Sequence, residues 1–89
     1  MKRYKRIAYV GKHDVSILWI NEGGTRSVRE IYEHAPPWAS FVILQEDEEY
    51  QCASLKSAKM RLGTGDWWFD NVLTFTSMDA AIMAAQLKL

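Results

Sequence analysis

The sequence predicts an α+β fold with an antiparallel sheet of about five strands and helices packed on one face of that sheet. Two observations lead to this prediction. Short runs of β-branched, aromatic and other apolar residues bounded by turn residues are typical of strands, and three serines each stand directly before residues with helical spacing. The chain has 89 residues, of which 48% are hydrophobic and 25% are charged. This length allows one hydrophobic core, so residues 1–89 are expected to form a single domain in the order β-β-α-β-β-α-β-α.

The N-terminal part is expected to form a β-hairpin. Strands are predicted over residues 3–10 and 15–21, because β-branched and aromatic residues fill both segments. The turn-forming segment Gly11-Lys12-His13-Asp14 separates them.

A short helix should follow this hairpin. Ser27 stands three residues before Glu30, which is the spacing of a capping box, and apolar residues then recur at helical spacing. Pro36-Pro37 would end the helix, since proline lacks the amide donor. A third strand continuing from the turn at Gly23-Gly24 is the alternative.

The middle of the chain predicts a second hairpin and a second helix. The apolar run 41–44 and the segment 50–53 would pair around an acidic tip. Ser54 can then cap a helix over residues 55–62, for which Gly63 supplies the left-handed end.

The C-terminal part predicts the clearest strand and a last helix. Over residues 67–76 large apolar residues alternate, with Trp67, Phe69, Leu73 and Phe75 on the inward face and Trp68 on the outward face. Ser77 would cap the final helix. The whole predicted core consists of Ile7, Tyr9, Ile17, Trp19, Val28, Ile31, Val42, Leu44, Leu55, Ala58, Leu62, Phe69, Leu73, Phe75, Ala81, Ile82 and Ala85.

No arrangement of residues in the sequence indicates catalysis, and no catalytic residue is assigned. One cysteine and two histidines cannot complete a four-ligand zinc site, so no metal and no cofactor are expected. Cys52 lies in a predicted strand, where a cysteine is more often a small packed residue than a nucleophile. A single cysteine also fits a reducing cytoplasm, and no segment is apolar and long enough to cross a membrane.

Two features suggest contact with a partner protein. The acidic run Glu46, Asp47, Glu48 and Glu49 could face a basic partner, although a solvated tip that discourages edge pairing is the alternative. Exposed tryptophans dominate many protein interfaces, and the outward Trp68 and the proline-flanked Trp38 are the candidates here. A second layer of structure covering Trp68 is the competing interpretation.

A third feature suggests contact with nucleic acid. Five cations precede the first acidic residue, and together with nearby tyrosines they could follow a phosphate backbone. The balanced net charge of the chain favours a different main function. These five residues are Lys2, Arg3, Lys5, Arg6 and Lys12.

The segment from Tyr50 to Leu89 combines a short strand, the sequence S-L-K-S-A-K, a tryptophan-bearing strand and the sequence T-S-M-D-A-A-I. It resembles the small α+β proteins that phages encode as accessory proteins or as inhibitors of host defence, anti-CRISPR proteins among them. The resemblance implies a stoichiometric inhibitor that blocks a host protein or protein complex without a cofactor. We therefore expect a non-enzymatic protein-interaction module in the host cytoplasm. The alternative is a nucleic-acid-binding accessory protein that uses the basic N-terminal strand.

Overall fold

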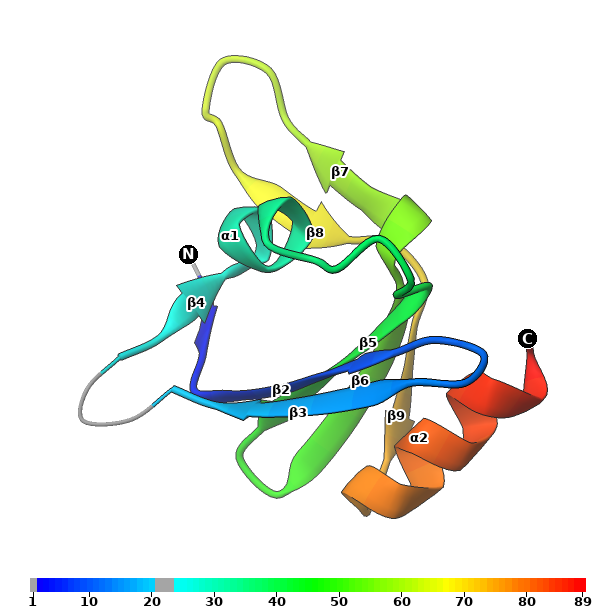
Figure 1. Cartoon of the computed structure of the whole chain (residues 1–89). Helices are drawn as coiled ribbons and strands as arrows, with labels where there is room; N and C mark the ends of the chain where they lie inside the picture. Colours follow the sequence, from blue (N-terminus) through cyan, green and yellow to red (C-terminus); the bar gives the residue numbers. More distant parts are fainter. Residues whose placement is uncertain (1, 21–23) are drawn as a thin grey trace.

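The computed structural model describes residues 2–20 and 24–89 and confirms the α+β class with a five-stranded antiparallel sheet (Figure 1). Two helices and several short strands accompany that sheet. In chain order the elements are β1 (Arg3–Tyr4), β2 (Arg6–Val10), β3 (Val15–Trp19), β4 (Arg26–Ser27), α1 (Val28–Glu33), β5 (Phe41–Glu46), β6 (Glu49–Ser54), the 3₁₀ turn η1 (Leu55–Ser57), β7 (Ala58–Met60), β8 (Trp67–Phe69), β9 (Val72–Phe75) and α2 (Met78–Leu87).

The main sheet has the strand order β3-β2-β5-β6-β9, which makes β3 and β9 its two edges. Both predicted hairpins are present, β2 with β3 and β5 with β6. At the end of the second hairpin Glu46 pairs with Glu49, and Asp47 takes the left-handed conformation with φ 55°. Residue 21, the end of the strand predicted over 15–21, lies outside the described residues, as does Gly23 of the alternative third strand.

The two helices cover opposite faces of the main sheet, so the prediction that helices pack on one face is wrong (Figure 1). The central strands β2 and β5 each contain four consecutive apolar residues, 7–10 and 41–44, and both faces of these segments therefore need cover. Ile7 and Leu44 pack toward α1, whereas their neighbours Ala8 and Ile43 pack toward α2.

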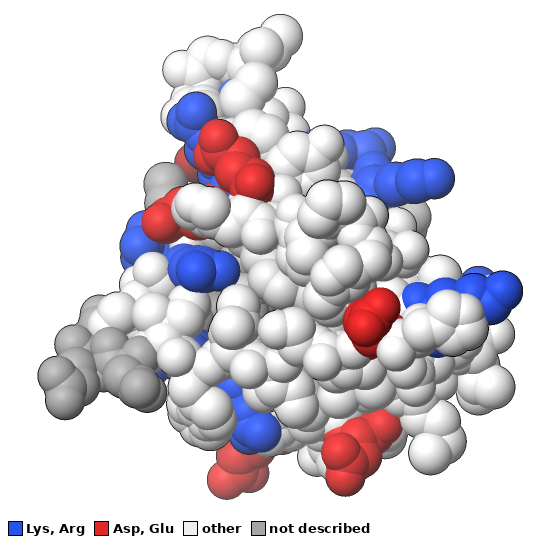
Figure 2. Space-filling model, in the orientation of Figure 1, with Lys and Arg blue, Asp and Glu red and all other residues white. Residues whose placement is uncertain are grey.

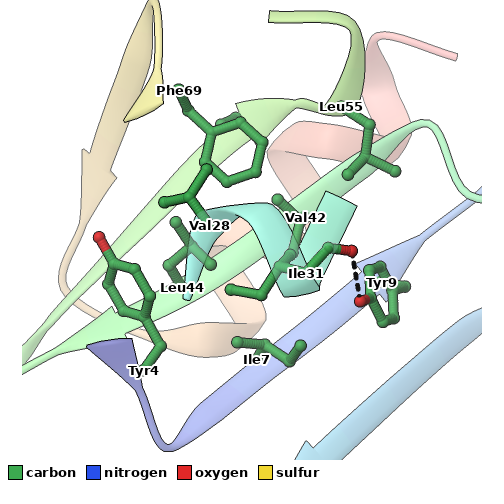
Figure 3. Packing of buried hydrophobic residues seen from close by; sticks show 10 residues of the cluster. Tyr4, Ile7, Tyr9, Val28, Ile31, Val42, Leu44, Leu55 and Phe69 are labelled. Carbon is green, nitrogen blue, oxygen red and sulfur yellow. Dashed lines mark hydrogen bonds between the residues drawn. The ribbon is translucent and has the colours of Figure 1, made fainter. Parts of the chain in front are cut away.

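The core on the α1 side is built around Ile31 and Tyr9 (Figure 3). The Tyr9 hydroxyl donates a hydrogen bond of 2.7 Å to the backbone oxygen of Ile31, which ties the helix to β2. The predicted capping box is confirmed: the Ser27 side chain accepts from the Glu30 backbone, and the Glu30 carboxylate accepts from the Ser27 backbone. Because α1 has only six residues, this packing and capping must hold it in place.

The helix predicted over residues 55–62 is wrong. Its first turn is the 3₁₀ turn η1, after which the chain extends as β7 and pairs with β8. The Ser57 hydroxyl donates a hydrogen bond of 2.7 Å to the Ser54 backbone oxygen. This local side-chain bond competes with a continued helix. Leu62, which was placed in the core, is 85% exposed.

The single strand predicted over residues 67–76 is also wrong, because it is broken into β8 and β9. Asn71 takes the left-handed conformation with φ 57°, and the Asp70 amide donates to the Ser57 backbone oxygen. The two halves then join different sheets. Phe69 is buried, as predicted, and packs on the α1 side. Leu73 was predicted to be core as well, but it lies on the edge strand β9 and is 47% exposed.

Most of the remaining residues predicted to be core are buried, but those on the edge strand β3 are exposed. Two residues of β3 that were placed in the core, Ile17 and Trp19, are 46% and 59% exposed. Their side chains lie on the α2 side, but α2 packs mainly on β5, β6 and β9 and leaves these two side chains largely exposed. The predicted core residues that are buried are Ile7, Tyr9, Val28, Ile31, Val42, Leu44, Leu55, Phe69, Ala81 and Ala85, while Ala58, Phe75 and Ile82 are partly buried.

Candidate binding surface

The acidic run lies at the turn between β5 and β6. Glu46 forms an ion pair with Lys2, with 2.8 Å between Nζ and Oε1, and both side chains are partly exposed. This pair neutralises one of the four carboxylates, while Asp47, Glu48 and Glu49 are exposed. The tip therefore carries less unpaired negative charge than the sequence alone indicates.

The two candidate tryptophans lie in different places. Trp38 follows α1 and sits against Gly11 at the β2–β3 turn, whereas the acidic tip lies at the other end of β5. Trp68 lies on β8, which pairs only with β7 among the described strands. Both tryptophans are 38% exposed, but Trp38 and the acidic run do not form one surface.

An aromatic cleft separates β8 from the main sheet. It has a volume of about 270 Å³, and Lys2 stands at one side of it. The Arg61 guanidinium lies 5.8 Å from the Trp68 ring centre. The Tyr32 and Trp67 ring centres are 5.7 Å apart, and the two rings are tilted by 36°. The Trp67 Nε1 atom is buried and has no hydrogen-bond acceptor among the described residues. The cleft is lined by Tyr4, Val28, Leu44, Gln51, Trp67, Trp68, Phe69 and Val72.

Four of the five N-terminal cations line one open hollow of about 490 Å³, which we call the basic hollow. Arg3 donates to the Thr25 hydroxyl and to Glu30, so part of this charge is already paired. The Arg6 guanidinium lies 4.6 Å from the centre of the Trp19 ring. Lys12 lies at the β2–β3 turn and is not part of the hollow, which is lined by Lys2, Arg3, Tyr4, Lys5, Arg6, Trp19, Thr25, Gln45, Glu46 and Asp47.

The exposure of the apolar side chains of the edge strand β3 is the feature that sequence reasoning missed. Its alternate residues Val15, Ile17 and Trp19 are 40%, 46% and 59% exposed. The signal for it was present as an apolar alternation, but the sequence does not show that α2 stops short of this edge. We call these three residues the β3 stripe.

The backbone of the β3 stripe also points outward. The Gly11 amide donates to the Asp14 backbone oxygen, and the Ile20 amide donates to the Lys5 backbone oxygen. Asp14 and Ile20, on either side of β3, are therefore residues that bond to the first strand of the hairpin. Bonded and outward-facing residues alternate in an antiparallel ladder. The N–H and C=O groups of the stripe therefore face away from β2, on the side where the described sheet has no further strand.

The residues considered for chemistry are dispersed. Cys52 is buried on the α2 side, and this burial raises the pKa of its thiol, which disfavours the reactive thiolate at neutral pH. His13 is exposed at the β2–β3 turn, and the His34 Nδ1 atom lies 2.9 Å from the Glu30 backbone oxygen. Within residues 2–20 and 24–89 no three His, Cys, Asp or Glu side chains are grouped so that they could hold a metal ion.

Burial of three titratable side chains predicts a loss of stability at alkaline pH. It raises the pKa of Tyr4, Tyr9 and Cys52 above the ordinary values of 10.0 for tyrosine and 9.0 for cysteine. Groups with a raised folded-state pKa stabilise the fold below their unfolded pKa, and this contribution is lost as the pH rises toward the folded value. We expect the urea midpoint to fall between about pH 8 and about pH 10.5, and to fall less in Cys52→Ala. A constant midpoint over this range would contradict the prediction.

Comparisons with protein-family models, curated proteins and solved structures find no match to this chain. The resemblance to phage-encoded inhibitors thus stays a prediction. Among the described residues, no helix has the length and apolar character needed to span a membrane.

Proposed function

We propose that this protein acts by binding another protein, and that β3 accepts an extended segment of that partner as an additional strand. One observation carries the proposal: in the β3 stripe, the three residues with outward backbone groups are the same three whose apolar side chains are exposed. Main-chain hydrogen bonds would supply affinity, and the exposed side chains would select the partner.

The composition of β3 supports this proposal. Edge strands in natural proteins are commonly protected by lysine, proline or a bulge. The sequence Val-Ser-Ile-Leu-Trp contains no charge and no proline, and its pairing with β2 is continuous over all five residues. The opposite edge, β9, is shorter and lies between the left-handed Asn71 and the cap of α2. The edge at β3 is therefore the better template for strand addition.

We place this interaction in the cytoplasm, because cytosolic proteins rarely contain disulfides and the single cysteine of this chain, Cys52, is free and buried. The expected biological role is stoichiometric inhibition of a host protein complex. Strand addition suits such a role because it needs no catalytic group, only an accessible edge on the inhibitor and an extended segment on the target.

The test replaces one outward amide. Ile17→Pro removes an N–H that faces away from β2, and proline is tolerated on sheet edges, so the hairpin should stay folded. A partner is first isolated from lysate with the wild-type protein and identified by mass spectrometry. Its affinity should then fall about 100-fold or more in Ile17→Pro, because one backbone bond and the central side chain are both lost. Ile17→Val should bind nearly as the wild type does.

Hydrogen exchange gives an independent measurement. The amides of Val15, Ile17 and Trp19 should gain protection when the partner binds, because only strand addition gives them acceptors. Trp68→Ala and the fourfold replacement of residues 46–49 by serine serve as comparisons for the rival surfaces. If Ile17→Pro binds like the wild type while either comparison variant loses the partner, the binding surface is not β3.

The basic hollow favours a second candidate function, the binding of single-stranded nucleic acid. Four cations and an exposed tryptophan are gathered there, and this combination suits phosphates and stacked bases. On the visible face of Figure 2, however, blue and red groups are interspersed without an extended basic area. Binding of a labelled oligothymidylate that weakens with salt and is lost in Lys5→Gln, but kept in Lys56→Gln, would support this function.

A further inference from the structure

The position of the Arg6 guanidinium relative to β3 indicates the chemistry of the partner segment. Arg6 belongs to β2 and lies opposite Trp19 in the ladder. Its guanidinium carbon is 4.6 Å from the centre of the Trp19 ring, so its charge is held against the edge strand's own side chain. The Arg6 Nε atom is buried and has no hydrogen-bond acceptor among the described residues. A fixed positive charge therefore stands at one end of the β3 stripe.

The other charges around this point leave the guanidinium available. Arg6 forms no ion pair within the described part of the chain, while Glu46 is paired with Lys2 and Glu30 with Arg3. Lys5, the residue before Arg6, also lines the basic hollow and is exposed. Of the carboxylates that line the hollow, only Asp47 lacks such a pairing in the described structure. The hollow thus favours an incoming anion at its Trp19 side.

We propose that the segment added to β3 runs antiparallel to it and carries an acidic side chain opposite Trp19, followed by apolar side chains opposite Ile17 and Val15. This inference rests on the proposed strand addition and specifies its partner. Residues that face each other across an antiparallel pair place their side chains on the same face of the sheet. A glutamate opposite Trp19 would thus lie on the face where Arg6 is held. Read from its N-terminus, the partner segment has the pattern acidic, any residue, apolar, any residue, apolar.

A second copy of this chain does not fit the pattern. Antiparallel self-pairing centred on Ile17 would place Val15 of one copy opposite Trp19 of the other. Val15 of the second copy would then lie near Arg6, which would gain no acidic partner. A different protein with an acidic residue at this place satisfies both the apolar stripe and the charge.

The experiment uses three blocked synthetic peptides of alternating valine and threonine that differ only in their charged pair. One begins with two glutamates, one ends with two glutamates, and one begins with two lysines. Calorimetry should show the glutamate-first peptide binding about tenfold more tightly than the lysine-first peptide, as one charge-assisted contact provides, and this preference should shrink with added salt.

Variants test whether Arg6 causes the preference for the glutamate-first peptide. Arg6→Gln should remove most of the difference between glutamate-first and lysine-first peptides, and Arg6→Lys should keep part of it. Lys12→Gln, at the opposite end of β3, should leave it unchanged. Circular dichroism checks that each variant is folded, and the salt dependence of the wild type tests the inference without any variant.

The outcomes separate this inference from the proposed function. Equal binding of all three peptides, with loss in Ile17→Pro, would overturn the acidic preference and leave strand addition standing. Tighter binding of the glutamate-last peptide would overturn the antiparallel direction. If none of the three peptides binds, the inference fails, whereas the proposed function is judged by the effect of Ile17→Pro on the isolated partner.

Discussion

Replacing Ile31 by alanine should lower the free energy of unfolding by about 2–5 kcal/mol, the range found when large aliphatic side chains are removed from a core. Ile31 is fully buried and is the residue of α1 that packs most deeply against the main sheet. The helix has six residues and cannot persist without its packing. Alanine favours helix more than isoleucine does, so any loss of stability reports packing and not propensity.

Urea denaturation followed by fluorescence and by circular dichroism measures this change. Leu73→Ala and Leu62→Ala are the controls, because these leucines are 47% and 85% exposed. Both should shift the free energy of unfolding by less than about 1 kcal/mol, as exposed positions generally do. A large loss in Leu73→Ala together with a small one in Ile31→Ala would mean that the burial described for the two faces is wrong.

The fold could be predicted from the sequence wherever the signal was local. Ser27 and Glu30 form the expected capping box, and the two hairpins follow from apolar runs separated by turn residues. The errors came where a strand pairing or a single backbone conformation overrode the periodicity of the residues. The pairing of β7 with β8 replaced a marginal helix, and a left-handed Asn71 turned one long strand into two. Apolar spacing reports neither the gain from pairing two short strands nor the backbone conformation of one asparagine.

The candidate binding surface could also be predicted only in part from the sequence. The cations of the N-terminus were found from the sequence because they are neighbours, and four of them do line one hollow. The β3 stripe was assigned to the core, since alternation shows that one face of a strand is apolar but not whether another layer covers it. The answer depends on the position of α2, which covers β5, β6 and β9 but leaves the edge at β3 open. The approach of Arg6 to Trp19 could likewise be seen only in three dimensions.

Replacing Gly11 by alanine should destabilise the protein by about 1–3 kcal/mol or more, as overpacking of a filled site does. A Cβ atom at this position would lie 2.5 Å from the Trp38 backbone oxygen and 2.8 Å from Cε3 of its ring. The backbone contact is the more serious one, because the Ser40 amide donates 2.9 Å to the Val10 oxygen and holds these two segments together. The chain cannot move away without breaking this connection.

A double-mutant cycle distinguishes the two contacts. Trp38→Ala removes the ring but keeps the backbone oxygen, so Gly11→Ala should remain destabilising in that background. If Trp38→Ala relieves the whole penalty, the ring alone fills the site and the backbone is free to adjust. Persistence of the penalty would show that the Trp38 segment fixes the β2–β3 turn, from which β3 extends. Trp38→Ala should then weaken partner binding only as far as it lowers the stability of that turn, because its ring lies outside the proposed path of the added strand.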